Sequence, residues 1–331
     1  MSTRSQRILT LAGALGGLVL FIYAVRRAGV GEIINGIQRV GWGLVPILVI
    51  AGLRFVLRTA AWRLCTPAGT RLPFGRALTV FLAGDAIGNV TPLGLIASEP
   101  TKVFLIRHHL ATRESVTSLA LDNLVYSASA LVMIAIGAVV MLANVPLSFA
   151  SREWSVVALV VLALACVIGL QVFRKGLGWS ARTDSPKRLR IAALRASMLE
   201  FSAGNPMRLW RAFAVDMTFH ALAVFEAYIT LRWLLGTLAP TLTEALLFEV
   251  LNRVITVAFK FVPFRVGIDE AVTGAFAPLL AVSSTAGVAL AVIRKVRNLF
   301  WNGIGLALIA VSHAREAPAT DRHGTAPAHR T

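Results

Sequence analysis

The stretch "GNVTPLGLIASEPTKVF", residues 88–104, interrupts a sequence that is strongly apolar on both sides. A helix-breaking proline (Pro92), an acid (Glu99) and a base (Lys102) fall within it. Irregular backbone at membrane depth is tolerated only where protein or a water-filled cavity satisfies its N–H and C=O groups. The stretch therefore predicts a broken or re-entrant segment that lines a polar cavity inside a membrane protein.

The composition supports a membrane protein and excludes most soluble classes. Of the 331 residues, 56% are hydrophobic and 15% are charged, and the mean hydropathy is +0.73. A soluble domain carries about 25% charged residues. The net charge of +17 does not indicate nucleic-acid binding in so apolar a chain. Basic loops facing an anionic cytoplasmic leaflet account for most of it, with a few basic groups left for an anionic ligand.

Apolar stretches of nearly the roughly 20 residues that cross a bilayer recur along the chain. Seven are candidate spanning helices: 8–25, 44–63, 116–143, 155–173, 211–235, 243–261 and 287–312. Two more, 77–97 and 264–282, are broken by Pro, Gly and polar residues. We predict an all-α polytopic membrane protein with about seven to nine transmembrane helices, two of them broken or re-entrant.

The predicted organisation is a single membrane domain, 1–313, with halves at about 44–143 and 211–312. The connection 174–210 carries eight basic residues against two acids, a net charge of +6. The positive-inside rule places it in the cytoplasm. Residues 314–331, rich in Ala, Pro, Arg and His, are predicted to form a disordered tail.

An internal repeat relates the two broken segments. "NVTPLGLIASE" (89–99) and "KFVPFRVGIDE" (260–270) both place a proline three residues after a polar residue and a glutamate seven residues after that proline. Each precedes a long helix with a charged residue followed by Asn-Leu: "DNLVY" from Asp122 and "RNLFW" from Arg297. We interpret the repeat as parallel. Paired interruptions in corresponding halves indicate the binding site of a transporter.

Four segments together resemble the lysylphosphatidylglycerol synthase transmembrane-region family of flippase-like membrane proteins. They are "RFVLRTAAWRL" (54–64), "GDAIGNVTPLGLIASEPTKVFLIRHH" (84–109), "LDNLVY" (121–126) and "FKFVPFRVGIDEAV" (259–272). The resemblance covers most of 8–312 and implies lipid translocation, or a role beside lipid synthesis, in a bacterial inner membrane. The chain looks like the membrane part of such a synthase, without the soluble aminoacyl-transferring domain.

Polar residues in and beside the apolar spans form the predicted substrate site. A charged side chain near the centre of a membrane helix costs about 2.5–3.5 kcal/mol on insertion scales, so several together need a function or a partner. The predicted substrate-binding residues are Arg54, Arg58, Asn89, Thr91, Gly94, Glu99, Lys102, Asp122, Asn123, Glu249, Arg253, Lys260, Gly267, Glu270 and Arg297.

Structural roles for some of these residues remain open alternatives. Arg58 extends to the inner interface on one interpretation, and Glu249 forms an ion pair with Arg253 within its helix on another. Asp122 and Arg297 are candidates to pair with one another or with Lys102.

The start of the helix that follows the first break gives another alternative. Ser98 resembles an N-cap, with Glu99 and Pro100 in the first turn. Three further acids, Asp85, Asp216 and Glu226, either carry a proton or neutralise a basic residue.

The function that this pattern favours is a lipid flippase or lipid-binding transporter. Its substrate is expected to be a polar-headed lipid, of an anionic phospholipid type. A non-transporting membrane partner of a lipid-modifying or glycan-assembling enzyme is the alternative. A membrane-embedded transferase with Glu99 or Glu270 as its base is a third hypothesis, but we expect no enzyme activity. No nucleotide-binding loop, nucleophile elbow or paired-His zinc motif is present in the sequence, so no cofactor and no metal are expected.

Overall fold

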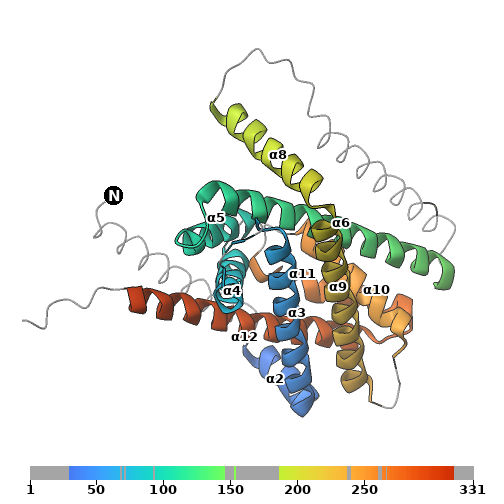
Figure 1. Cartoon of the computed structure of the whole chain (residues 1–331). Helices are drawn as coiled ribbons and strands as arrows, with labels where there is room; N and C mark the ends of the chain where they lie inside the picture. Colours follow the sequence, from blue (N-terminus) through green and yellow to red (C-terminus); the bar gives the residue numbers. More distant parts are fainter. Residues whose placement is uncertain are drawn as a thin grey trace, which may run out of the picture.

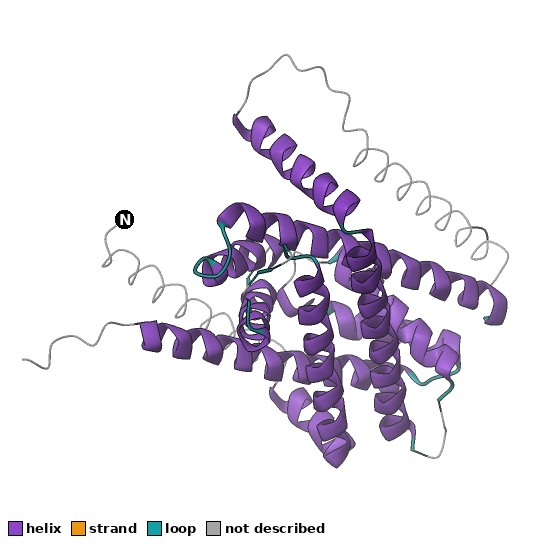
Figure 2. Ribbon diagram, in the orientation of Figure 1, coloured by secondary structure: helices purple, strands orange, loops and turns teal. Residues whose placement is uncertain are grey.

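The structure is a computed structural model, and every regular element in the part of the chain that it describes is a helix (Figure 2). The described residues are 30–67, 69–70, 72–91, 94–145, 153, 186–236, 240–259, 263–265 and 267–316. The predicted spans 8–25 and 155–173 and most of the tail 314–331 lie outside them. The all-α prediction is confirmed.

The elements follow the predicted spans with shifted ends. In chain order they are α2 (Val30–Val40), η1 (Gly41–Gly43), α3 (Leu44–Leu64), α4 (Phe74–Val90), α5 (Gly94–Ile106), α6 (Thr112–Asn144), α8 (Pro186–Gly204), α9 (Pro206–Leu235), α10 (Leu242–Ala258), η2 (Pro263–Arg265), α11 (Ile268–Phe276), η3 (Ala277–Leu280) and α12 (Ser284–Glu316). Both predicted broken segments are interrupted: the first between α4 and α5, the second around η2.

Three described segments are long and apolar enough to cross a membrane: Gln38–Leu64, Thr112–Asn144 and Pro206–Leu235. They correspond to α3 with the residues just before it, α6 and α9. Helix α12 is as long as α6, 33 residues each. It carries three basic residues near its middle, Arg294, Lys295 and Arg297.

The lengths of the helices repeat along the chain. Helices α4 and α10 both have 17 residues, and α6 and α12 both have 33. Between them, α5 has 13 residues, whereas α11 has 9 and is followed directly by the 4 residues of η3. With α3 and α9 in front, the order α3–α4–α5–α6 matches α9–α10–α11–α12.

The two repeats run in opposite directions, so the prediction of a parallel repeat was wrong. Helices α3 and α9 lie side by side (Figure 1). The start of α3 meets the end of α9, because a Cβ at Gly43 would lie 2.5 Å from the ring of Trp233. At the other end, Arg208 donates a hydrogen bond of 3.2 Å to the carbonyl of Arg63. A sequence motif does not show in which direction its segment crosses the membrane. That direction depends on how many times the chain crosses the membrane between the two halves.

Each half contains a helical hairpin. In the first, α4 packs antiparallel against α5: Gly84 faces Lys102, and a Cβ at Gly94 would lie 2.4 Å from the carbonyl oxygen of Gly88. In the second, α11 packs antiparallel against the start of α12, with Gly274 against Val288. Glycine permits both close approaches because a side chain would collide with the facing helix.

The halves interlock because the matching helices α4 and α10 each pack on the long helix of the other half. Helix α4 packs on α12, and α10 packs on α6. A Cβ at Gly305 of α12 would lie 2.4 Å from the carbonyl oxygen of Leu82, and one at Gly137 of α6 would lie 2.3 Å from Val250. Both crossings thus depend on a small residue, as helix contacts in membranes commonly do.

Each half also has its own apolar core. Trp62, Phe81 and Ile106 belong to a buried cluster built by α3, α4, α5 and α6. Leu231, Phe248 and Leu290 belong to the corresponding cluster of α9, α10 and α12. The space between the two cores is where the polar side chains of the halves meet.

Exposed tryptophans mark the two ends of the membrane-spanning part. Trp210 and Trp233, 68% and 50% exposed, lie near opposite ends of α9, and Trp42, 87% exposed, precedes α3. The 23 residues between Trp210 and Trp233 cover about 34 Å of helix, close to the thickness of a bilayer.

The end near Trp210 is rich in arginine, including Arg63, Arg107, Arg113 and Arg208. The positive-inside rule therefore orients this end toward the cytoplasm. The hairpin α4/α5 begins and ends on this side, whereas α10 and α12 begin on the opposite side, where Ala245 and Val282 belong to one cluster with Leu235 at the end of α9.

This orientation predicts labelling from opposite faces. In a chain with Cys65→Ala and Cys166→Ala, the variants His109→Cys and Ser283→Cys place single thiols at exposed positions. A membrane-impermeant maleimide should label Ser283→Cys in intact cells and His109→Cys only in inverted vesicles. Labelling of both from the same side would contradict the inverted arrangement.

The close packing of α4 against α12 can be tested by a substitution that adds one methyl group. Gly305→Ala should lower the free energy of unfolding by about 1–3 kcal/mol, because the added Cβ overpacks the crossing. Gly75→Ala is the matched control, since a Cβ there meets nothing within 4 Å, and it should be neutral or slightly stabilising. Thermal unfolding of the purified proteins in detergent measures both, and equal melting temperatures would contradict the packing described.

Candidate functional site

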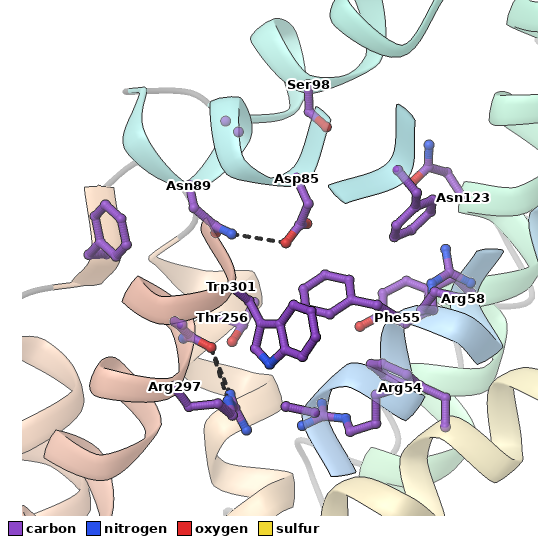
Figure 3. Close-up of a pocket in the computed structure, with 18 of the residues that line it drawn as sticks. Arg54, Phe55, Arg58, Asp85, Asn89, Ser98, Asn123, Thr256, Arg297 and Trp301 are labelled. Carbon is purple, nitrogen blue, oxygen red and sulfur yellow. Dashed lines mark hydrogen bonds between the residues drawn. The ribbon is translucent and has the colours of Figure 1, made fainter. Parts of the chain in front are cut away.

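A cavity of about 300 Å³ lies between the two halves (Figure 3). Both halves contribute to its wall, which includes α3, α4, α5 and α6 from the first and α9, α10, η2 and α12 from the second. The lining residues are Ala51, Arg54, Phe55, Arg58, Phe81, Asp85, Gly88, Asn89, Thr91, Gly94, Ser98, Glu99, Lys102, Asn123, Tyr126, Phe219, Asn252, Arg253, Thr256, Phe264, Arg265, Arg297, Asn298 and Trp301.

The two interruptions meet at this cavity. Thr91 and Gly94 line it from the first, and Phe264 and Arg265 line it from the second. Phe264 and Arg265 have φ angles of 51° and 47°, a left-handed conformation that costs roughly 1–2 kcal/mol per residue other than glycine. Strained backbone of this kind concentrates at functional sites. The convergence expected from the paired motifs is therefore present.

The wall of the cavity is predominantly basic. Among the described lining residues, six are basic (Arg54, Arg58, Lys102, Arg253, Arg265 and Arg297) and two are acidic (Asp85 and Glu99). Several further acids stand behind the basic groups instead of in the cavity. Each arginine of the wall thus lines the cavity while it is paired with an acid.

Arg58 joins three helices. Its Nη2 donates a hydrogen bond of 2.7 Å to Asp122 of α6, and its Nη1 donates one of 2.5 Å to Asp216 of α9. The guanidinium also lies over the ring of Tyr126, 4.3 Å from the ring centre. All three charged groups are buried, so this cluster replaces the water that each would otherwise need.

Glu226 of α9 holds a second pair of arginines. It accepts a hydrogen bond of 2.7 Å from Arg54 of α3 and another from Arg297 of α12. The acid is 3% exposed, and its two partners come from different halves. Glu226 therefore links both halves at the floor of the cavity.

Glu249 of α10 holds a third pair. It accepts a hydrogen bond of 2.8 Å from Arg253 and one of 3.2 Å from Arg294. Arg253 also donates to the hydroxyl of Tyr126 at 2.6 Å. The predicted pairing of Glu249 with Arg253 inside α10 is present, and Arg253 still lines the cavity.

Two arginines of the wall keep an unused donor. Arg54 and Arg253 are 8% and 7% exposed, and the Nε of each is buried without a hydrogen-bond partner in the described structure. Both guanidinium groups lie over the ring of Phe219, at 4.6 and 5.2 Å from its centre. Both residues line the cavity, so their positive charges would stabilise an anion bound there.

The first hairpin contributes the other side of the wall. Lys102 forms an ion pair of 3.0 Å with Glu99 and lies 4.4 Å from the ring centre of Phe81. Asn89 donates hydrogen bonds to Asp85 at 3.1 Å and to Asn302 at 3.2 Å, and Figure 3 shows the Asn89–Asp85 pair facing the cavity. The Thr91 hydroxyl donates to its own helix, to the carbonyl of Ile87 at 2.7 Å.

The structure brings most of the predicted site residues together. Those that line the cavity are Arg54, Arg58, Asn89, Thr91, Gly94, Glu99, Lys102, Asn123, Arg253 and Arg297. Asp122 and Glu249 stand behind it as ion-pair partners. Lys260 lies outside the described residues. Substrate contact by these residues stays a prediction.

Gly267 and Glu270 lie apart from the cavity lining. Gly267 has a φ of 84°, which glycine adopts without strain, and its N–H donates to Glu270 at 2.9 Å in the cap of α11. Glu270 also forms an ion pair with Lys295 of α12. The second motif thus fixes the start of α11, and the residues preceding it reach the cavity.

Two local predictions were wrong. Asp122 and Arg297 pair neither with one another nor with Lys102, because the inverted arrangement gives each a partner in its own half, Arg58 and Glu226 respectively. Ser98 is not an N-cap, since α5 begins at Gly94 and continues through Pro100. Pro100 lies in the second turn of α5, close enough to the start for few hydrogen bonds to be lost.

The repeat could have identified residues that the sequence interpretation missed. In "DNLVY", Asn123 and Tyr126 line the cavity, and in "RNLFW" the matching Asn298 and Trp301 also line it. Aligning the two motifs would have transferred Asn123 to Asn298. The partners of Arg54 and Arg58 on α9 carry no such signal, because they depend on how the halves pack.

Fold and site together define an all-α integral membrane protein with a basic, partly aromatic cavity between two inverted halves. The chain belongs to the lysylphosphatidylglycerol synthase TM region family, whose family model matches residues 8–305. No curated protein and no solved structure shows significant similarity to the chain. The chain is thus a membrane domain of a kind associated with lipid biosynthesis or transport.

The Arg58 cluster predicts a large loss of stability on one substitution. Arg58→Met should lower the free energy of unfolding by about 3–5 kcal/mol, because Asp122 and Asp216 would remain buried without a cation. Arg113→Met is the control, since the exposed Arg113 binds only the Ser197 hydroxyl among the described groups, and it should change stability by less than about 0.5 kcal/mol. Similar unfolding curves for the two variants would refute this account.

Proposed function

We propose that the protein is a flippase or lipid-binding transporter for a polar-headed lipid, with an anionic phospholipid as its substrate. The head group would occupy the cavity between the halves while the acyl chains stay in the bilayer. The protein would thus move lipid between leaflets and would not transform it. We expect it in the inner membrane of a bacterium.

The two guanidinium groups that Arg54 and Arg253 place in the cavity wall are the observation that supports this proposal most directly. A phosphodiester offers acceptor oxygens and one negative charge, which suits guanidinium donors. Both donors lie near the middle of the bilayer, because Phe219, which both guanidinium groups cover, stands 9 residues from Trp210 and 14 from Trp233. Those intervals correspond to about 14 and 21 Å of helix.

The inverted halves supply a route for alternate exposure. Helix α4 leads to the first interruption from the arginine-rich end, and α10 leads to the second interruption from the opposite end. Rocking of one half against the other would open the cavity to each side in turn, as in transporters built from inverted repeats.

Reconstitution tests the function. Purified protein in liposomes should exchange labelled phosphatidylglycerol between leaflets faster than empty vesicles do. Arg54→Gln and Arg253→Gln should each reduce exchange by about 10- to 100-fold, which corresponds to a lost charged hydrogen bond of roughly 1.5–3 kcal/mol. Neither substitution leaves a buried acid without an ion-pair partner, because Glu226 still pairs with Arg297 and Glu249 still pairs with Arg294.

Arg190→Gln is the control, and it also helps to distinguish transport from the alternative function as a membrane partner. Arg190 lies exposed on α8, a helix that packs on α6 outside the cavity, so its loss should leave exchange unchanged. If the protein instead serves as a membrane partner of a lipid-modifying enzyme, exchange would equal that of empty vesicles. Neutralising Arg190 and Arg195 would then abolish the cellular activity, whereas the Arg54 and Arg253 substitutions would not.

A further inference from the structure

Asp85 is the acid of the cavity wall that has no basic partner among the described residues. Its Oδ2 accepts a hydrogen bond of 3.1 Å from Asn89, and in the described part of the chain no basic side chain forms an ion pair with it. The other lining acid, Glu99, pairs with Lys102. Asn89 in turn donates to Asn302, whose own amide nitrogen is buried without a hydrogen-bond partner. Asp85 therefore lies in a polar but uncharged contact at the cavity (Figure 3).

Asp85 differs in charge from the residue at the same distance from the start of α10. Asp85 is the twelfth residue of α4, and Arg253 is the twelfth residue of α10. Arg253 pairs with Glu249 one turn earlier in its helix, and the matching residue in α4 is Phe81. The twelfth residues of α4 and α10 thus carry opposite charges, and only the basic one is neutralised within its own helix.

A count of charges shows what Asp85 does to the cavity. Ion pairs on and directly behind the wall contain seven basic side chains (Arg54, Arg58, Lys102, Arg253, Arg265, Arg294 and Arg297) and six acids (Glu99, Asp122, Asp216, Glu226, Glu249 and Asp269). These described pairs carry one excess positive charge, and the separate pair of Lys295 with Glu270 does not alter it. Ionised Asp85 cancels the excess, and protonated Asp85 leaves it.

We propose that Asp85 is a proton-binding site linked to the anion site, so that the protein binds one proton together with one monoanionic phosphodiester. An incoming phosphodiester neutralises the excess positive charge in place of the Asp85 carboxylate. The carboxylate then faces an added negative charge at low dielectric and takes up one proton from the bulk solution, which reaches Oδ through the cavity. The head group and the proton together leave the cavity neutral.

The charged groups around Asp85 favour this exchange over a fixed ion pair. Those that share the cavity wall from the neighbouring elements are Arg58 of α3, Glu99 and Lys102 of α5, Arg265 of η2 and Arg297 of α12. Each of these five is held by another acid or base. Asp85 can therefore change its charge without breaking an ion pair.

The consequence of this inference is proton-coupled movement of the lipid, and that consequence rests on the proposed function. Binding of the anion and binding of the proton are linked, so each must strengthen the other by the same factor. Affinity for the anionic lipid should rise as the pH falls, by up to about tenfold per pH unit for one linked proton. A lower pH on one side of the membrane would then drive the lipid away from that side.

Proton uptake on binding tests the linkage without requiring transport. Purified full-length protein in weakly buffered detergent, with a pH-indicating dye, is titrated with short-chain phosphatidylglycerol. We expect uptake of about one proton per bound lipid, and none with diacylglycerol, which lacks the phosphate. Glycerophosphoglycerol, the same head group without acyl chains, shows whether the anion site needs a lipid. Binding of phosphatidylglycerol without proton uptake would overturn the inference and leave the proposed function standing.

Variants assign the proton to Asp85. Asp85→Asn should abolish proton uptake and the pH dependence of the dissociation constant, and Asp85→Glu should restore both. Glu114→Gln, which removes an exposed acid of α6, should behave as the wild type. Unchanged proton uptake in Asp85→Asn would overturn the assignment. Binding with proton uptake but no leaflet exchange in liposomes would support the proton site and refute transport.

Discussion

The structure depends on the mutual neutralisation of charges buried between its two halves. Arg58 binds Asp122 and Asp216, and Glu226 binds Arg54 and Arg297, with all of these side chains nearly excluded from solvent. An isolated charge at this depth would be costly. Since the partners come from different helices and both halves, the ion pairs stabilise the assembled domain and specify one way for the halves to meet.

The ion pairs of the two halves are related by the inverted repeat. Arg58 of α3 pairs with Asp122 of α6, and in the second half Glu226 of α9 pairs with Arg297 of α12. Matching helices thus use the same pairing with the signs exchanged. Two halves of identical sequence would bring like charges together at their shared interface, and exchange of the signs lets α3 and α9 attract one another through Arg54 and Glu226.

The cavity is a consequence of the same arrangement. Because the acids stand behind the arginines, the wall presents donors while its total charge stays near balance. Such a wall can take up a single anionic group without first expelling a bound counterion. The strained turn at Phe264 and Arg265 and the glycine contact between Gly88 and Gly94 keep both interruptions close to this wall. The family assignment places such a site in a membrane domain linked to lipid biosynthesis or transport.

The sequence by itself determined the all-α membrane class, the positions of the described spanning helices, the two interruptions and most of the polar residues at the cavity. Those features are local: they follow from apolar length, from proline and glycine, and from the cost of charge in lipid. Tertiary structure alone decided that the repeats are inverted, that Asp216 and Glu226 neutralise Arg58 and Arg54, and that Asp85 has no basic partner in the described part of the chain. These features depend on the direction in which α9 packs against α3. The spacing of residues along one helix does not show which side chain of the other helix they will contact.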